Sequence, residues 1–129
     1  MNCLLDTSPY IWLIDDNTRL SKNAKAVIEN SENKIYLSTI SFWEIVIKRS
    51  LGKLAFEPTL DQMYQDVQTL DIALLSLEMH HLKTLETLEY RAKHKDPFDR
   101  VIISQAMAEN LSIISADSKF SDYPVPLVW

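Results

Sequence analysis

The sequence predicts an α/β domain with three layers, α/β/α, in which helices cover both faces of a central parallel sheet. Short, continuously apolar runs alternate along the chain with amphipathic segments, a pattern typical of strands that are buried on both faces. The 129 residues, 47% of them hydrophobic and 24% charged, suit a single globular domain over residues 1–129. No repeat, low-complexity tract or linker divides the chain.

The first thirty residues predict one strand and two helices. Cys3–Leu5 is a short apolar run closed by Asp-Thr-Ser-Pro, so we expect a buried strand that leads into a helix over Tyr10–Ile14, with Pro9 at its first position. Ser21–Asn30 has apolar residues at helical spacing and is the second predicted helix.

The middle of the chain repeats this alternation. Ile35–Leu37 is the next predicted strand, and a longer helix follows over Ser38–Leu51. Gly52 is expected to end that helix as its left-handed cap. Thr59–Leu70 is amphipathic and predicts another helix.

The last part of the chain predicts the remaining elements of the sheet. Ile72–Leu75 is strand-like, and Ser76 opens a helix that runs through Leu85. Asp96–Asn110 has the clearest helical pattern, with proline directly after its first residue. Leu111–Ile114 and Val125–Trp129 are the last two predicted strands.

Rare residue types exclude several classes of protein. The single glycine, Gly52, rules out the glycine-rich loops that bind nucleotide phosphates, and the single cysteine, Cys3, rules out an internal disulfide and multi-cysteine metal sites. The three histidines do not form H-E-x-x-H. Oxygen ligands remain: 18 Asp and Glu against 13 Lys and Arg give a net charge of −5, which argues against a broad basic face for duplex DNA.

No part of the sequence is typical of a secretion signal or a membrane span. The first residues carry no basic region, and Asp6 interrupts the first apolar run. No apolar stretch approaches the ~18 residues that a membrane-spanning helix needs. We therefore expect a soluble, cytoplasmic protein.

Several carboxylates flank the predicted strands, at the edge where parallel α/β sheets collect their ligands. A cluster of like charges either holds protons or recruits a cation, and all-oxygen sites suit Mg²⁺ or Mn²⁺. The pattern therefore indicates metal-assisted hydrolysis. The acids are Asp6 after the first strand, Glu44 in the helix after the second, Asp96 and Asp99 at the start of the helix before the fourth, and Asp117 beyond the fourth.

These acids also have structural interpretations. Asp6 and Asp96 are suited to cap helices, and an acid beyond a strand also fits an ordinary turn. Glu44 either completes a capping box with Ser41 or pairs with Lys48 four residues later. The apolar residues around Glu44 nevertheless indicate that its carboxylate needs a partner.

Four segments carry a family resemblance, in family order from Leu4 to Trp129. They are Leu4–Thr7, Ser41–Lys48 continuing to Leu51–Leu54, Asp96–Ala106, and Ser115–Asp117. They resemble the PIN-domain ribonucleases, and specifically the VapC-type toxins of type II toxin–antitoxin pairs. The W-E-I-x-I-K…L-G-K-L and D-P-F-D-R blocks are specific in combination, whereas Asp-Thr alone is a weak signal.

The resemblance implies a PIN-like fold and an endoribonuclease that depends on Mg²⁺ or Mn²⁺. Asp6, Glu44, Asp99 and Asp117 match the family's acidic cluster and are the expected catalytic and metal-binding residues. We expect Asp6 and Asp99 to be direct metal ligands. Glu44 and Asp117 complete the site directly or through water.

Further residues are expected to support the metal or contact RNA. Thr7 and Ser115 match hydroxyl positions that orient a ligand or water. Asp96 belongs to the motif, with capping as its simpler role. His94 is a candidate to shuttle a proton, but a lone histidine in a charged loop is more often simply exposed, and we interpret it so. The basic side chains expected to hold RNA phosphates are Lys48, Arg91, Lys93, Lys95 and Arg100.

The resemblance also implies partners. VapC-type toxins are commonly homodimers and are neutralised by a small antitoxin protein. Core packing is the default for aromatic side chains at helical spacing, but some of these are candidate antitoxin contacts. The candidates are Tyr10, Trp12, Phe42, Trp43, Phe56 and Tyr64.

Two other functions compete with the ribonuclease. A phosphate-acceptor domain of receiver type also places an Asp on a parallel sheet, but it needs an adjacent acidic pair after the first strand and a lysine beyond the last strand. The chain has Asp6-Thr7-Ser8 after the first strand and no lysine after Lys119. A catalytically inactive PIN-like module that binds a protein or RNA is the second alternative. Residue types alone do not separate that module from an enzyme.

Overall fold

Five strands form one sheet in the order β3-β2-β1-β4-β5, and every neighbouring pair is parallel. The structure, a computed structural model, describes residues 1–90 and 94–129. At the centre of the sheet, Leu4 lies between Tyr36 and Ile113. The strands are β1 (Asn2–Leu5), β2 (Lys34–Ser38), β3 (Ile72–Leu75), β4 (Ser112–Ile114) and β5 (Leu127–Val128).

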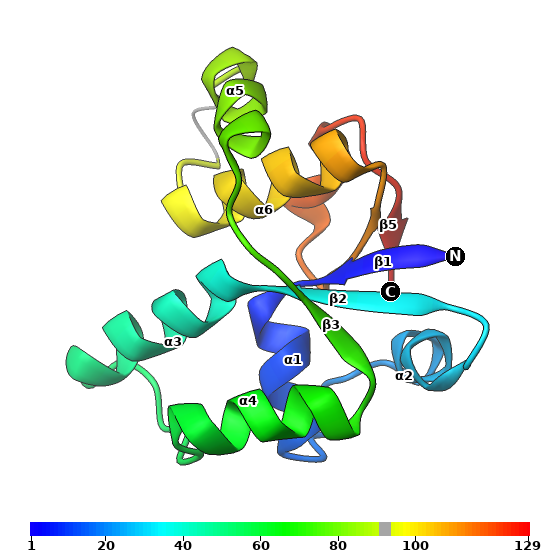
Figure 1. The fold of residues 1–129 in the computed structure, drawn as a ribbon, viewed down its shortest axis with the longest axis vertical. Helices are drawn as coiled ribbons and strands as arrows, with labels where there is room; N and C mark the ends of the chain where they lie inside the picture. The colour runs from blue at the N-terminus through cyan, green and yellow to red at the C-terminus, as the bar shows by residue number, and fades with distance from the viewer. Residues whose placement is uncertain (91–93) are drawn as a thin grey trace.

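Helices lie on both sides of this sheet. Figure 1 shows α5 and α6 on one side and α1, α2 and α4 on the other, while α3 extends from the end of β2. The predicted three-layer α/β/α fold with a parallel sheet is confirmed. The helices are α1 (Thr7–Ile14), α2 (Lys22–Glu29), α3 (Thr39–Ser50), α4 (Leu60–Thr69), α5 (Met79–Thr87) and α6 (Pro97–Glu109), with a 3-10 helix, η1 (Ser118–Asp122).

The central strand divides the core into two clusters. Side chains alternate between the faces of a strand, so Cys3 and Leu5 pack with Tyr10 on one face, while Leu4 packs with Ile102 on the other. Cys3, Leu4 and Leu5 are all fully buried. This explains why the strand is continuously apolar in sequence and fixes the position of the residue that follows it.

Two predicted helix starts differ from the structure. The first helix begins at Thr7, with Asp6 as its N-cap, so Pro9 is its third residue and not its first. Proline is tolerated there because the first N–H groups of a helix have no partner within the helix. The helix predicted from Ser76 begins at Met79, where Glu78 is the N-cap and its backbone N–H bonds to the ring of His81.

Helices α3 and α6 are each followed by a residue in the left-handed conformation. Gly52 follows α3 with a φ of 68°, as expected for a left-handed cap. Asn110 ends α6 in the same conformation, with a φ of 56°. None of the helices in the described part of the chain has the length and hydrophobicity needed to cross a bilayer.

Candidate metal centre

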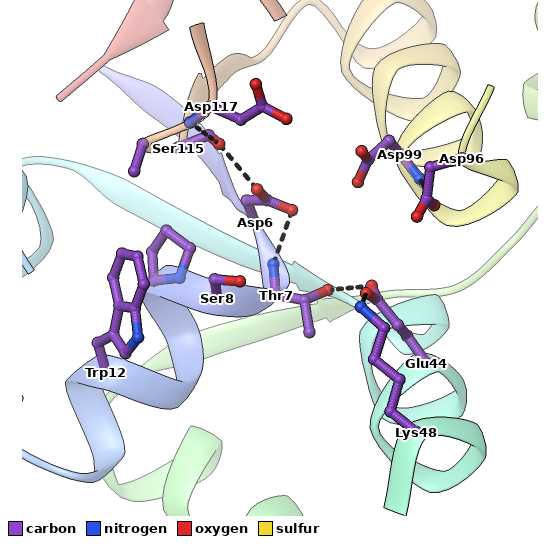
Figure 2. A pocket seen from close by; sticks show the side chains of 12 residues that line it. Asp6, Thr7, Ser8, Trp12, Glu44, Lys48, Asp96, Asp99, Ser115 and Asp117 are labelled. Carbon is purple, nitrogen blue, oxygen red and sulfur yellow. Dashed lines mark hydrogen bonds and ion pairs between the residues drawn. The ribbon is translucent and has the colours of Figure 1, made fainter. Parts of the chain in front are cut away.

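A pocket of about 320 Å³ opens beyond the carboxyl ends of β1, β2 and β4. Five carboxylates and one lysine are among its lining residues. Figure 2 shows the acidic side chains arranged around one open space, although they come from four different parts of the chain. All four acids of the predicted cluster line this pocket: Asp6, Glu44, Asp99 and Asp117.

Asp6 sits at the end of the central strand, where the chain turns into α1. Its Oδ1 accepts a hydrogen bond of 2.8 Å from the backbone N–H of Thr7, and its Oδ2 accepts one of 2.8 Å from the hydroxyl of Ser115. The side chain is therefore both a helix cap and part of the pocket wall. The capping and site interpretations of Asp6 are compatible.

Glu44 reaches the pocket from α3 and is buried there. The hydroxyl of Thr7 donates to Glu44 Oε1 at 2.8 Å and lies 2.8 Å from the hydroxyl of Ser41. Lys48, one turn further along α3, forms an ion pair with Glu44 Oε2. Of the two interpretations of Glu44, the pairing with Lys48 is the one that the structure contains.

Asp96 and Asp99 stand at the N-terminus of α6. Asp96 Oδ1 accepts from the backbone N–H groups of Phe98 and Asp99, at 2.9 and 3.0 Å, so Asp96 is a helix cap as expected. The Asp99 carboxylate is left to face the pocket. It also contacts the ring of His94, 2.9 Å from Nε2.

Asp117 lies beyond the end of β4 and caps η1. Its Oδ1 accepts from the backbone N–H of Lys119 at 2.9 Å, and its own N–H donates to the Ser115 hydroxyl at 3.0 Å. Ser115 therefore touches Asp6 through its proton and Asp117 through its oxygen. A single hydroxyl joins two of the acids.

The pocket is electrostatically costly near neutral pH. Burial raises the pKa of Asp6 to about 7; the hydrogen bond from Ser115 opposes this rise, and the charge of Asp99 adds to it. Burial also raises the pKa of Asp99 to about 6, against the hydrogen bond from His94. For Lys48, burial works to lower the pKa, but the hydrogen bond and charge of Glu44 raise it overall. A bound cation would relieve the repulsion between these carboxylates.

The donor set fits a hard divalent cation. Carboxylate and hydroxyl oxygens dominate the pocket, and such ligands suit Mg²⁺ and Mn²⁺. One potential ligand atom from each of Asp99, Asp117 and His94 lies within 4.8 Å of the others, so these three side chains meet at one side of the pocket. Cys3 is the single cysteine of the sequence, and it is buried in β1.

The basic side chains predicted to contact RNA differ in where they lie. Lys48 lines the pocket, and Lys95 is exposed one residue before Asp96. Arg91 and Lys93 lie outside the described residues.

The prediction that Arg100 contacts RNA phosphates is wrong. It is buried, and its guanidinium donates to the backbone carbonyls of Leu88 and Glu89, both at 3.0 Å, and lies over the ring of Tyr90. These contacts hold the guanidinium against the chain after α5, so Arg100 does not face the pocket.

The predicted exposure of His94 is also wrong. The charged residues around it predict an exposed ring, but the side chain is only 3% exposed. The His94 side chain lies against the start of α6, where it contacts Asp99, five residues later. The basic residues around His94 indicate a solvated loop, and no local pattern in the sequence signals the contact with Asp99.

The order of the strands, the acids at their carboxyl ends and the oxygen-rich pocket define a parallel α/β domain with a candidate site for a divalent cation. A family model described as the PIN domain matches residues 3–126. The chain belongs to the PIN domain family. A comparison with curated proteins finds no match.

Solved structures share this fold over nearly the whole chain. A chain of VapBC-1 from nontypeable Haemophilus influenzae is 18% identical, with a TM-score of 0.67, and the match covers 98% of this chain and 96% of that one. A chain of VapBC2 from Rickettsia felis, bound to a DNA fragment from its promoter, is 18% identical with a TM-score of 0.64 and coverages of 98% and 97%. A toxin–antitoxin complex from Klebsiella pneumoniae gives 18% identity, a TM-score of 0.62 and coverages of 98% and 96%.

Proposed function

We propose that this protein is a VapC-type toxin: an endoribonuclease, dependent on Mg²⁺ or Mn²⁺, that acts in the cytoplasm as one half of a type II toxin–antitoxin pair. The observation that carries the proposal is the meeting of four acids from separate elements in one pocket. Membership of the PIN domain family and the likeness in fold to chains of toxin–antitoxin complexes support it.

In this proposal Asp6 and Asp99 hold the ion directly, and Glu44 and Asp117 complete the site directly or through water. The ion, when bound, neutralises charge on a phosphodiester and makes a water molecule more acidic. Ser115 keeps the Asp6 carboxylate in one orientation, and Thr7 does the same for Glu44.

The RNA contacts are proposed for the basic side chains at the rim. The Lys48 ammonium pairs with Glu44 and also lines the pocket, so it can contact a phosphate that enters. Lys95 extends from the surface beside the N-terminus of α6. Arg91 and Lys93 remain predicted contacts, whereas Arg100 is withdrawn because its guanidinium is already bonded to backbone carbonyls.

The protein partners are a cognate antitoxin and a second copy of the chain. Among the aromatic candidates, Tyr10 and Phe56 are buried in the core and are withdrawn as antitoxin contacts. Trp43 and Tyr64 are more than half exposed and remain candidates.

RNA cleavage tests the proposal. Purified protein is incubated with total cellular RNA in Mg²⁺ or Mn²⁺, and cleavage sites are mapped by sequencing the new 5′ ends. We expect cleavage that EDTA abolishes and that Asp6→Asn and Asp99→Asn both lose while the proteins remain folded by circular dichroism.

Glu109→Gln is the matched control, because Glu109 is an acid of the same helix as Asp99 but does not line the pocket. It should cleave at the wild-type rate. Cleavage that persists in EDTA would contradict the metal-dependent mechanism. A folded wild type that binds Mn²⁺ but cleaves no RNA would favour the inactive binding module.

A further inference from the structure

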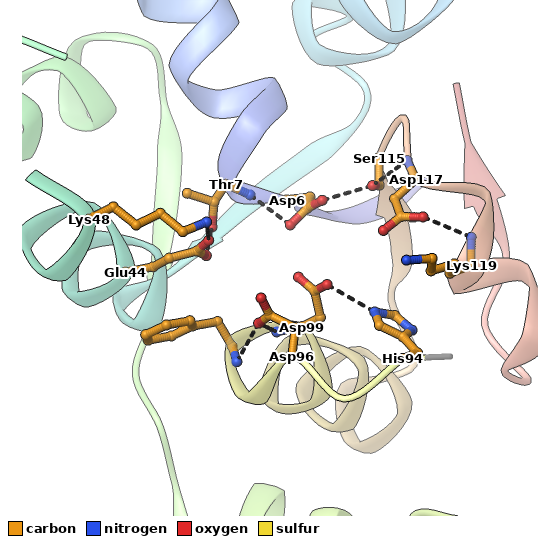
Figure 3. A network of polar contacts seen from close by, with 11 residues as sticks. Asp6, Thr7, Glu44, Lys48, His94, Asp96, Asp99, Ser115, Asp117 and Lys119 are labelled. Atoms are coloured by element: carbon orange, nitrogen blue, oxygen red, sulfur yellow. Dashed lines mark hydrogen bonds and ion pairs between the residues drawn. The ribbon is translucent and has the colours of Figure 1, made fainter. Parts of the chain in front are cut away.

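A buried imidazole stands directly behind one of the proposed metal ligands. His94 Nε2 lies 2.9 Å from Asp99 Oδ2, and the ring packs edge-on against Phe120 and Tyr123, with centroid distances of 5.3 and 5.4 Å. Figure 3 shows the imidazole on the side of Asp99 away from Glu44 and Lys48. The ring therefore contacts both α6, which carries Asp99, and the segment after Asp117.

The contact fixes which ring nitrogen carries the proton. An ionised carboxylate only accepts hydrogen bonds, so the pair requires a proton on Nε2. His94 Nδ1 is buried and has no hydrogen-bond partner among residues 1–90 and 94–129. Among these residues, the ring therefore makes its hydrogen bond through Nε2 alone.

This arrangement controls the direction of the Asp99 carboxylate. Within the described parts of the chain, His94 supplies the one side-chain hydrogen bond to that carboxylate, and it engages Oδ2. Oδ1 is left available on the pocket side. The edge-on packing against Phe120 and Tyr123 supports the donor ring from two sides.

We propose that His94 is a positioning residue that holds Asp99 in the orientation needed to bind a divalent ion. The inference rests on the proposed function, in which Asp99 is a ligand. His94 acts by donating from Nε2 and does not bind the ion. A metal on Nε2 would force the ring proton onto Nδ1, where the described residues offer no acceptor.

Two variants separate the hydrogen bond from the packing. His94→Phe keeps a ring against Phe120 and Tyr123 but loses the donor. His94→Gln loses the ring but keeps an N–H at a similar distance from the backbone. The control is His80→Phe, because His80 also bonds to a carboxylate, Glu109, at 2.7 Å, outside the pocket.

Calorimetric titration with Mn²⁺ alone, on the full chain, measures the effect. We expect His94→Phe to weaken binding about 10–100-fold, the range for loss of a residue that orients a metal ligand. His94→Gln should bind within about threefold of the wild type, and His80→Phe should be unchanged, since a retained donor or a distant site leaves Asp99 oriented. Equal affinity of the wild type and His94→Phe would overturn the inference, as would a His94→Gln variant as weak as His94→Phe.

A measurement on the wild type keeps the inference testable if a variant does not fold. Nitrogen-15 NMR of the histidine rings, with and without Mg²⁺, should show the His94 proton on Nε2 in both states. A proton that moves to Nδ1 on Mg²⁺ binding would identify His94 as a ligand and overturn the positioning role. Failure of the wild type to bind either ion would instead overturn the proposed function together with the inference.

Discussion

Two histidine–carboxylate contacts in this molecule place the same groups in different electrostatic settings. Between α5 and α6, His80 and His81 both direct Nε2 at Glu109 Oε1, at 2.7 and 2.8 Å, and their hydrogen bonds lower the pKa of Glu109. In the pocket, His94 makes a similar contact with Asp99 at 2.9 Å, yet burial raises the pKa of Asp99 to about 6.

The surroundings of each carboxylate, and not its histidine partner, decide whether its pKa is raised or lowered. Glu109 is partly exposed, so water solvates its charge and the two hydrogen bonds dominate. Asp99 is more buried and shares its pocket with other acids, so one hydrogen bond does not offset the lost solvation. The first contact stabilises the fold, whereas the second holds a costly charge in place.

Removing each carboxylate should give opposite changes in metal-free stability and very different changes in metal binding. Asp99→Asn removes a charge that burial makes costly, so we expect the free energy of unfolding at pH 7.5 to rise by about 1–2 kcal/mol. The same variant should lose Mn²⁺ affinity by more than the about 100-fold typical of an indirect effect. Glu109→Gln should lose about 0.5–1 kcal/mol and keep its affinity. Chemical denaturation measures the stability, and Mn²⁺ titration measures the affinity. A destabilised Asp99→Asn variant would contradict the claim that the Asp99 charge is costly to the metal-free fold.

The pH dependence of stability should also separate the two regions. Asp6 and Asp99 have folded pKa values of about 7 and 6, above their unfolded value of 3.8, so the folded metal-free chain binds more protons between these limits. Stability should therefore fall as pH rises from about 4 to 7. Glu109 acts with the opposite sign, since its lowered pKa adds stability above the unfolded value that is lost at acid pH.

Thermal melts from pH 5 to 8 test this. In EDTA the melting temperature should decline towards pH 8, and Asp6→Asn should flatten that decline. In excess Mg²⁺ the stabilisation by the ion should increase with pH, because ionised carboxylates bind it. A metal-free wild type that becomes more stable from pH 5 to pH 7 would show that the pocket acids do not repel one another as proposed.

Residues at the ends of strands were predictable because sequence and topology place them together. Parallel strands bring their carboxyl ends to one edge, so the positions of Asp6 and Asp117 follow from the apolar runs before them. The special conformation of Gly52 was predictable for a similar reason, since it depends on the residue itself and its neighbours. The three-layer fold followed from the alternation of apolar runs and amphipathic segments.

Side chains whose role depends on a loop path were not predictable. His94 and Arg100 are both polar residues near the start of α6, and nothing in their spacing indicates which partners they take. Arg100 bonds to the chain after α5, and His94 bonds to Asp99 at the pocket. Tertiary contacts decide both cases, and local sequence patterns contain no record of them.

The ion pair between Lys48 and Glu44 involves a third carboxylate, which is buried. The Glu44 side chain is 7% exposed, so Lys48→Met leaves a buried acid with Thr7 as its remaining side-chain partner. We expect a loss of about 1–2 kcal/mol, reduced from the cost of a fully buried pair because Lys48 itself is 42% exposed. Excess Mg²⁺ should recover part of this loss if Glu44 contributes to the ion site. Denaturation with and without Mg²⁺ checks both statements, and an equal loss in the two conditions would separate Glu44 from that site.

The smallest effect is expected at His80, because the two histidines at Glu109 are not equivalent. The backbone N–H of Glu78 donates to His81 Nδ1 at 2.9 Å, so His81 carries its proton on Nε2 and donates to Glu109 while it also caps α5. His80 shares the same acceptor oxygen from a side chain that is 56% exposed.

His80→Gln should therefore change the free energy of unfolding by less than about 0.5 kcal/mol, as at most surface positions. His81→Phe should lose at least about 2 kcal/mol, because phenylalanine can neither accept from the backbone N–H of Glu78 nor donate to Glu109. Equal losses in urea denaturation would mean that the shared carboxylate, and not burial, sets the strength of this contact.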